Sequence, residues 1–241
     1  KFNSLNILII GDVMIDAYWW GGVNRISPEA PVPVCAVNEK ESKLGGAANV
    51  ALNIAAMGAN PILCSVVGED YQGHQLCELM KKQNMDTNGI VFSSNRPTTV
   101  KTRIIGNKTQ MLRIDEETDV NISLSEEKIF LDKIESIINT EKINAIIFQD
   151  YDKGVITEGV ITKIIEIAKR KNIPVTVDPK KRNFTAYKNV DLFKPNLKEL
   201  KEGLKIDFDN VDKDVLVEAS LLLHYKQKIE KVFITLSERG V

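Results

Sequence analysis

Six short apolar runs recur along the chain, and segments with helical periodicity lie between most of them. Each run ends at or beside a glycine, aspartate, asparagine or threonine, where a buried strand would reach its carboxyl end. Runs of this length and spacing are typical of strands in a parallel sheet. They cover residues 5–11, 60–68, 143–150, 173–178, 190–196 and 231–236.

The intervening segments have apolar residues at helical spacing. Residues 125–139 place Ile129, Phe130, Ile134 and two further isoleucines on one face, with Ser125 as the expected N-cap. Residues 157–171 and 212–227 follow the same pattern. Because strand–helix–strand connections are right-handed, we expect an α/β fold with a mostly parallel sheet covered on both faces.

Two regions lack this alternation, residues 17–44 and 89–116. The first contains three prolines and no helical period, and the second resembles hairpin material with a Gly-Asn-Lys turn at 106–108. We predict a small β-sheet inserted in two pieces into a single domain that spans residues 1–241. Such a lid would close over substrate, and its edges would favour pairing with a second subunit.

Composition excludes several classes of protein. The formal net charge is −1, with 32 Lys and Arg against 33 Asp and Glu, so we expect neither a nucleic-acid partner nor an anionic membrane surface. No stretch approaches the roughly 20 apolar residues of a membrane span. The three cysteines form no C-x-x-C pair and, with two histidines, no metal-ligand pattern. These features favour a cytoplasmic protein.

Candidate site residues follow the strands, because ligands of open α/β sheets bind beyond the carboxyl ends. Asp16 is followed by apolar and aromatic residues, where a carboxylate needs partners, and it suits sugar hydroxyls. Asp12 fits a turn-capping role equally well. Asp150 and Lys153 follow the strand expected at 143–150. Lys101 and Arg103 share one face of an expected lid strand; Arg25 and Arg113 are further cations. For any one of these four, a solvated surface charge is the favoured interpretation, whereas Lys153 is the stronger candidate.

Gly45 and Gly46 precede a helical run in "KLGGAANVALNIAAMG". Their spacing matches neither G-x-G-x-x-G nor a P-loop. The pair would leave backbone N–H groups open at a helix start, with Asn49 one turn in, for a hydroxyl-rich or anionic ligand. Glycines required only for close packing are the competing interpretation.

Asn196 and Glu199 lie at i and i+3 near an expected helix start. The ordinary interpretation of this pair is a capping box. The functional one is that Glu199 orders water around a hard cation such as Mg²⁺.

Together these motifs resemble those of the ribokinase/PfkB-like carbohydrate kinases, and more narrowly the D-glycero-β-D-manno-heptose-7-phosphate kinases. The resemblance covers essentially the whole chain, and "RISPEAPVPV" at 25–34 is its most discriminating piece. The matching motifs, in chain order, are Gly11-Asp-x-x-x-Asp16, Gly45-Gly-Ala-Ala-Asn49, Asp150-Tyr-Asp-Lys153, Asp178-Pro-Lys180, Asn196-Leu-Lys-Glu199 and Thr235-Leu-Ser-Glu-Arg-Gly240.

The resemblance implies a three-layer α/β/α fold with a β lid, ATP, Mg²⁺ and phosphorylation of a sugar phosphate at its anomeric hydroxyl. It implies that Asp16, Gly45, Gly46 and Asn49 hold the sugar, and that Lys153, with Lys101 and Arg103, faces its phosphate. It also implies a homodimer through the lid and an adenylyltransferase, fused or separate. The residues implied at the ATP–Mg²⁺ site are Lys180, Asn196, Leu197, Lys198, Glu199, Thr235, Ser237, Glu238 and Gly240.

One motif of the family is missing from the 241 residues. Its general base is an Asp in a G-A-G-D motif after the T-x-S-E-x-G segment, and the sequence ends at Val241 without it. We therefore expect no catalytic base in this polypeptide and little or no kinase activity from it. Alternatives are another kinase of the superfamily and a non-catalytic sugar-phosphate-binding module; a dinucleotide-dependent oxidoreductase is disfavoured because no G-x-G-x-x-G follows the first strand.

Overall fold

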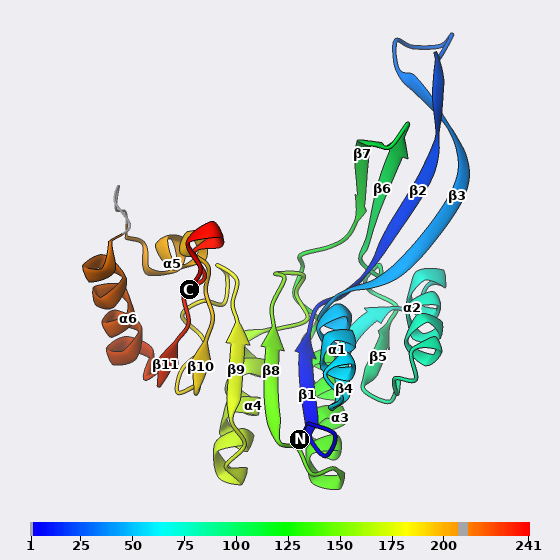
Figure 1. Cartoon of the computed structure of the whole chain (residues 1–241). Helices are drawn as coiled ribbons and strands as arrows, with labels where there is room; N and C mark the ends of the chain where they lie inside the picture. Colours follow the sequence, from blue (N-terminus) through cyan, green and yellow to red (C-terminus); the bar gives the residue numbers. More distant parts are fainter. Residues whose placement is uncertain (1, 207–211) are drawn as a thin grey trace.

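The computed structural model describes residues 2–206 and 212–241 (Figure 1). Its main sheet has seven strands in the order β11-β10-β9-β8-β1-β4-β5, and all neighbouring strands are parallel. All six predicted runs are strands of this sheet, although the last two are only two residues long. The strands are β1 (Asn6–Gly11), β4 (Asn60–Gly68), β5 (Ile90–Ser93), β8 (Ala145–Gln149), β9 (Val175–Asp178), β10 (Leu192–Phe193) and β11 (Lys231–Val232).

Helices cover both faces of the sheet, which confirms the predicted α/β architecture. Alternate residues of β1 enter two separate cores: Ile7 and Ile9 pack with α1 and α2, whereas Leu8 and Ile10 pack with α3 and α4. The helices are α1 (Ala47–Ala56), α2 (Tyr71–Lys82), α3 (Leu124–Thr140), α4 (Glu158–Lys171), α5 (Leu197–Leu204) and α6 (Lys213–Gln227), with a 3₁₀ turn at Ser237–Arg239.

The N-cap of α3 corrects one prediction. Ser123, not Ser125, caps the helix, and Ser123 with Glu126 forms a complete capping box. Ser123 is the preferred cap because Glu126, three residues later, accepts a hydrogen bond from the backbone amide of Ser123. Ser125 has Lys128 at the equivalent position.

A second sheet of four strands rises from the carboxyl edge of the first (Figure 1). Its order is β3-β2-β6-β7, with β2 and β6 parallel and the other two pairs antiparallel. Asn107 and Lys108 form the β6–β7 turn with φ of 50° and 67°, as expected for a tight hairpin. The strands are β2 (Val13–Ile26), β3 (Pro33–Gly46), β6 (Val100–Gly106) and β7 (Thr109–Glu116).

The segment 89–116 is not hairpin material throughout, which corrects its expected extent. Its first part is β5, which pairs with β4 in the main sheet from Ser65↔Ile90 to Gly68↔Ser93. Ile90 and Val91 are buried there. A short apolar run fits a strand of either sheet, so its sequence did not specify which one it joins. No helix in the described residues is long and apolar enough to cross a membrane.

Candidate functional site

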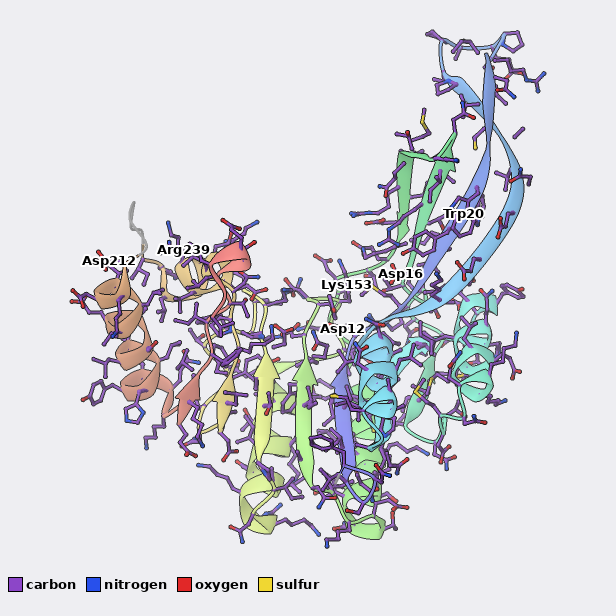
Figure 2. All side chains as sticks on the ribbon, in the orientation of Figure 1. Asp12, Asp16, Trp20, Lys153, Asp212 and Arg239 are labelled. Atoms are coloured by element: carbon purple, nitrogen blue, oxygen red, sulfur yellow. The ribbon has the colours of Figure 1, made fainter. Side chains whose placement is uncertain are left out.

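Side chains predicted to bind a ligand gather at the carboxyl edge of the main sheet, where the four-stranded sheet begins. Figure 2 places Asp12, Asp16 and Lys153 together above β1 and β8. Asp12 is the single residue between β1 and β2, and Lys153 lies in the loop after β8. This edge is where an open α/β sheet binds its ligands.

Asp16 lies on one face of the four-stranded sheet beside basic residues. It is aligned with Lys43 of β3 and Lys101 of β6. Arg103 Nη1 donates to Asp16 Oδ1 at 2.6 Å. The side chain of Asp16 remains partly exposed, so its carboxylate is held in place and still open to a ligand hydroxyl.

Gly45 and Gly46 are both required by close approach. A Cβ on Gly45 would overlap the Asp16 carboxylate, because it would lie only 3.0 Å from the carboxylate carbon Cγ. Gly46 has φ +59° and precedes α1, whose first amide, on Ala47, donates to the Asp12 carbonyl at 2.9 Å. No side chain caps α1, and Asn49 is exposed in its first turn. The pair thus serves close packing, and the helix start that follows it has no side-chain cap.

Asp12 departs from its predicted role as a substrate ligand. Its side chain is buried, and it accepts hydrogen bonds from the backbone amides of Tyr151 (2.8 Å), Lys153 (3.2 Å) and Val155 (3.2 Å). Burial raises the pKa of Asp12 to about 6, and the nearby Asp150 carboxylate adds to the rise. Asp12 holds the loop after β8 rather than facing a ligand.

Asp150 is likewise directed inward, which corrects its place among the predicted substrate ligands. Its Oδ2 accepts from Asn183 Nδ2 and from the Tyr187 hydroxyl, both at 3.0 Å, and its Oδ1 accepts from the Asp152 amide at 2.8 Å. Burial raises the pKa of Asp150. Position after a strand predicted the location of both aspartates, but it did not predict the direction of their side chains.

Lys101 and Lys153 bind the same carboxylate, that of Glu117. Lys101 Nζ lies 2.6 Å from Glu117 Oε2, and Lys153 Nζ lies 2.7 Å from Glu117 Oε1. Asp115 makes two more ion pairs, one with Lys101 and one with Arg113. Arg25 is exposed near the far end of β2 and lies outside this cluster. Sequence reasoning missed Glu117, because its partners are 16 and 36 residues away.

The predicted nucleotide residues meet at a separate place on the carboxyl edge. Asn196 caps α5 and forms the capping box with Glu199. An isolated parallel bridge joins Asn196 to Thr235. A cavity of about 750 Å³ lies here, within the range of small-molecule sites. Its lining comprises Asn196, Leu197, Lys198 and residues 235–241, which include Ser237, Glu238 and Gly240.

Glu199 is buried with both oxygens engaged. Oε2 accepts from the Asn196 amide at 2.9 Å, and Oε1 pairs with Lys180. Burial opposes the charge of Lys180, but Glu199 outweighs it and raises the lysine pKa. In residues 2–206 and 212–241 no cluster of three or more His, Cys, Asp or Glu could hold a metal.

Two further residues at this edge were not predicted. Arg96 donates from Nη2 to the Lys153 carbonyl, so it supports the same loop as Asp12. Tyr151 lies in the loop after β8, and Lys180 Nζ is 6.0 Å from its ring centroid. The only signal for Tyr151 was its place directly after Asp150.

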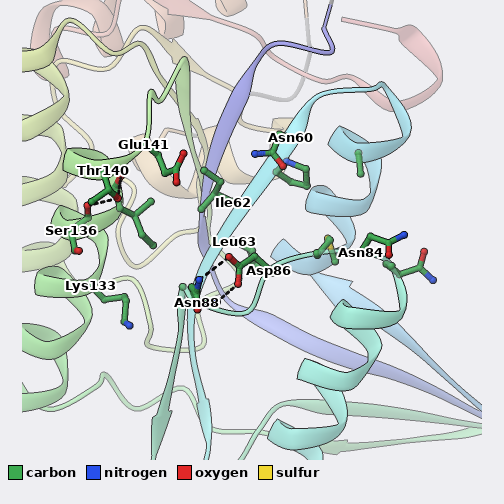
Figure 3. Close-up of a pocket in the computed structure, with 16 residues that line it drawn as sticks. Asn60, Ile62, Leu63, Asn84, Asp86, Asn88, Lys133, Ser136, Thr140 and Glu141 are labelled. Atoms are coloured by element: carbon green, nitrogen blue, oxygen red, sulfur yellow. Dashed lines mark hydrogen bonds between the residues drawn. The ribbon is translucent and has the colours of Figure 1, made fainter.

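A different hollow opens at the opposite edge of the main sheet. It is lined by α1, the start of β4, the segment after α2 and the second half of α3, including Asn60, Asp86, Asn88 and Lys133 (Figure 3). Its volume is about 460 Å³. None of the predicted site residues lines it, so it is separate from the site described above.

Comparison with known proteins gives the family of the chain. Residues 4–241 match the family model described as pfkB family carbohydrate kinase. The chain belongs to the pfkB family of carbohydrate kinases. Bifunctional protein HldE of Aliarcobacter butzleri is 39% identical over 236 residues, and that of Wolinella succinogenes is 41% identical over 235. These alignments cover 98% of this chain and 49% of each relative. The chain thus spans about half the length of the relatives.

Solved structures of sugar kinases confirm the fold. Phosphofructokinase-2 from Escherichia coli in complex with fructose-6-phosphate has a TM-score of 0.73 at 18% identity, over 98% of this chain and 75% of that one. Arabidopsis thaliana ribokinase complexed with ribose and ATP has a TM-score of 0.65 at 14% identity, over 97% and 72%. At these identities the likeness concerns the fold alone.

Proposed function

We propose that this pfkB-family chain binds the two substrates of a kinase that transfers phosphate from ATP to the anomeric hydroxyl of D-glycero-β-D-manno-heptose 7-phosphate. The product would be the 1,7-bisphosphate, a precursor of ADP-heptose for the lipopolysaccharide core. Family membership supports a sugar kinase, and the HldE relatives support this branch of it.

The observation that carries the choice of a phosphorylated sugar is the convergence of Lys101 and Lys153. Two ammonium groups from different sheets meet at one carboxylate, on the same side of the site as Asp16. A neutral sugar needs hydroxyl partners, whereas a sugar phosphate also needs cations. In this assignment Asp16 and the start of α1 bind hydroxyls, and the lysines with Arg103 bind the phosphate.

ATP is assigned to the cavity between Asn196–Lys198 and residues 235–241, with Lys180 beside it. Mg²⁺ is proposed only together with ATP, whose phosphates are its usual ligands in kinases. Any contact with Glu199 would pass through water. The family's G-A-G-D aspartate is not among residues 1–241, so turnover by these residues alone is expected to be very low.

The test is a substrate comparison on a polypeptide that includes that motif. We expect ATP-dependent consumption of heptose 7-phosphate at a kcat/KM at least 100-fold above that for fructose 6-phosphate or ribose. Lys153→Gln should raise KM for the heptose phosphate, whereas Lys163→Gln, a matched change on α4, should not. Equal or better turnover of a neutral sugar would overturn the proposal.

A second function from the same family is another sugar-phosphate kinase, and a non-catalytic sugar-phosphate-binding module is a third. The same comparison separates them: a different preferred sugar supports the second, and tight binding without turnover by the longer polypeptide supports the third. An adenylyltransferase, fused as the name of the bifunctional relatives suggests or separate, is part of the proposal, as is a cytoplasmic location.

We also propose a homodimer formed through the four-stranded sheet, which would act as a lid. Leu112 and Ile114 of β7 are exposed on the face opposite Asp16 and Lys101, and β3 and β7 are open edges. Exposed apolar residues grouped on a sheet favour pairing with another chain. Leu112 and Ile114 lie two residues apart on β7, and Ile26, Val32 and Val37 are further exposed apolar residues of the β2–β3 hairpin.

A further inference from the structure

Glu117 connects the two sheets. It directly follows β7, where the chain leaves the four-stranded sheet for α3. Its partner Lys101 belongs to β6 of that sheet, whereas Lys153 belongs to the loop after β8 of the main sheet. Each carboxylate oxygen accepts from one lysine, at 2.6 and 2.7 Å. One side chain therefore joins the four-stranded sheet to the loop that Asp12 and Arg96 hold.

These ion pairs are largely withdrawn from solvent. The exposed fraction is 25% for the side chain of Glu117, 16% for Lys101 and 18% for Lys153. Burial alone would raise the pKa of Glu117, but hydrogen bonds from Lys101 and Lys153 outweigh burial and lower it. Attraction between charges is stronger in such surroundings than at an open surface. Glu117 is thus firmly ionised and bound.

The position of Glu117 conflicts with an open phosphate site. The ammonium groups of Lys101 and Lys153 already have an anion between them, and Arg103 is paired with Asp16. Lys101 already divides its donors between Glu117 and Asp115. A ligand phosphate that lies between the two lysines therefore competes with the Glu117 carboxylate for the same N–H groups. A phosphate monoester carries up to two negative charges near neutral pH, against one for glutamate, and offers three acceptor oxygens.

We propose that Glu117 is a resident anion of the phosphate site, displaced by the phosphate of the substrate, and that this competition makes it a specificity-determining residue. This proposal rests on the proposed function in one respect only, that the phosphate belongs to a sugar. A ligand with one negative charge is attracted to the two lysines too weakly to displace Glu117, whereas a ligand with two charges is attracted more strongly. Displacement also breaks the contact between Lys153 and the segment after β7, so phosphate binding frees one connection between the sheets.

The test uses inorganic phosphate and acetate as probes on the 241-residue polypeptide, with binding followed by calorimetry at pH 7.5. Glu117→Gln should bind phosphate at least tenfold more tightly than the wild type and should gain measurable acetate binding. Glu116→Gln is the matched control, because Glu116 is an exposed neighbour with the same charge. It should change phosphate affinity by less than twofold.

A direct signature accompanies the affinities. In the wild type, the ¹³C resonance of the Glu117 carboxyl should shift as phosphate is added. When Lys153→Gln is combined with Glu117→Gln, the increase in phosphate affinity caused by Glu117→Gln should disappear. Equal or weaker phosphate binding by Glu117→Gln than by Glu116→Gln overturns the proposal. So does a Glu117 resonance that phosphate leaves unchanged.

The outcome is independent of the substrate assignment. If Glu117→Gln tightens phosphate binding while the longer polypeptide fails to use heptose 7-phosphate, the role of Glu117 is supported and the proposed substrate is contradicted. If heptose 7-phosphate is consumed and Glu117→Gln binds phosphate no more tightly than the wild type, the proposed function is supported and the role of Glu117 is contradicted.

Discussion

The Asp16 carboxylate occupies the space into which a side chain at Gly45 would project. The two residues lie on neighbouring antiparallel strands, and Arg103 holds the carboxylate from the other side. Glycine at 45 therefore fixes where the acid can lie. In the proposed function, that position receives the sugar hydroxyls.

Gly45→Ala should displace Asp16 and weaken sugar-phosphate binding about tenfold. Overpacking a buried position of this kind costs about 1–3 kcal/mol of unfolding free energy. Calorimetry and urea denaturation measure the two effects. Gly22→Ala is the control in the same strand pair, since its Cβ would meet only the side chain of Asn24. Unchanged ligand affinity in Gly45→Ala would contradict the role given to this pair.

Asp12 and Glu126 should titrate far apart in one experiment. Burial raises the pKa of Asp12 to about 6. Burial acts the same way on Glu126, but hydrogen bonds from Ser123 and Ser93 lower its pKa to about 2. A ¹³C carboxyl titration should resolve both values, and Asp150→Asn should lower that of Asp12 by removing a neighbouring charge. A value of 4 for Asp12 in the wild type would contradict this account of its burial.

The raised pKa of Asp12 has a definite sign for stability. Between pH 3.8 and about 6 the folded protein retains a proton that the unfolded chain releases. The contribution of Asp12 to the free energy of unfolding therefore falls as pH rises through this window, by about 3 kcal/mol at about 1.4 kcal/mol per pKa unit. Comparing the wild type with Asp12→Asn by denaturation at pH 4 and pH 7 measures this difference.

Asn196→Ala should weaken both α5 and ATP binding. Loss of a helix N-cap costs about 1 kcal/mol, and Asn196 also lines the cavity proposed to bind ATP. Asp212→Ala removes the N-cap of α6, which lies outside that cavity, so it should cost similar stability without changing ATP affinity. Denaturation with nucleotide titration tests the pair. Equal loss of ATP affinity in both variants would argue against the assigned nucleotide site.

Leu112→Glu should convert the proposed dimer to a monomer. The side chain is 56% exposed on β7, where a charge would lie within the apolar interface. Leu124→Glu serves as the control, because Leu124 is 85% exposed at the start of α3. Light scattering across a range of concentrations distinguishes the two. A wild type that is monomeric throughout would rule out this interface.

The sequence predicted the main sheet well, because buried parallel strands are continuous apolar runs of distinctive length. It misassigned β5 because pairing with β4 depends on tertiary contacts that a four-residue run does not encode. Ser123 was missed as the cap although its acid partner Glu126 lies at the diagnostic spacing. Asp12 and Asp150 were located at the correct edge, but only the folded loop after β8 determines that they point inward.

The ion pairs of the site were the feature that was hardest to predict from the sequence. Lys101 and Lys153 were identified as cations near the site, yet the carboxylate that neutralises them belongs to neither motif. Glu117 follows β7 in a run of acids whose individual contacts depend on the angle between the sheets. Motif spacing predicts which residues share an edge, and distances in three dimensions are needed to see which are already occupied.

Asp12 is the only residue between β1 and β2, so a change in the angle between these two strands acts on its backbone torsions. The same residue fixes three amides of the loop that carries Lys153. A swing of the four-stranded sheet and a shift of that loop therefore share one pivot. In the proposed function the four-stranded sheet is the lid and Lys153 binds the phosphate, so a change in the angle of the lid would also move that lysine.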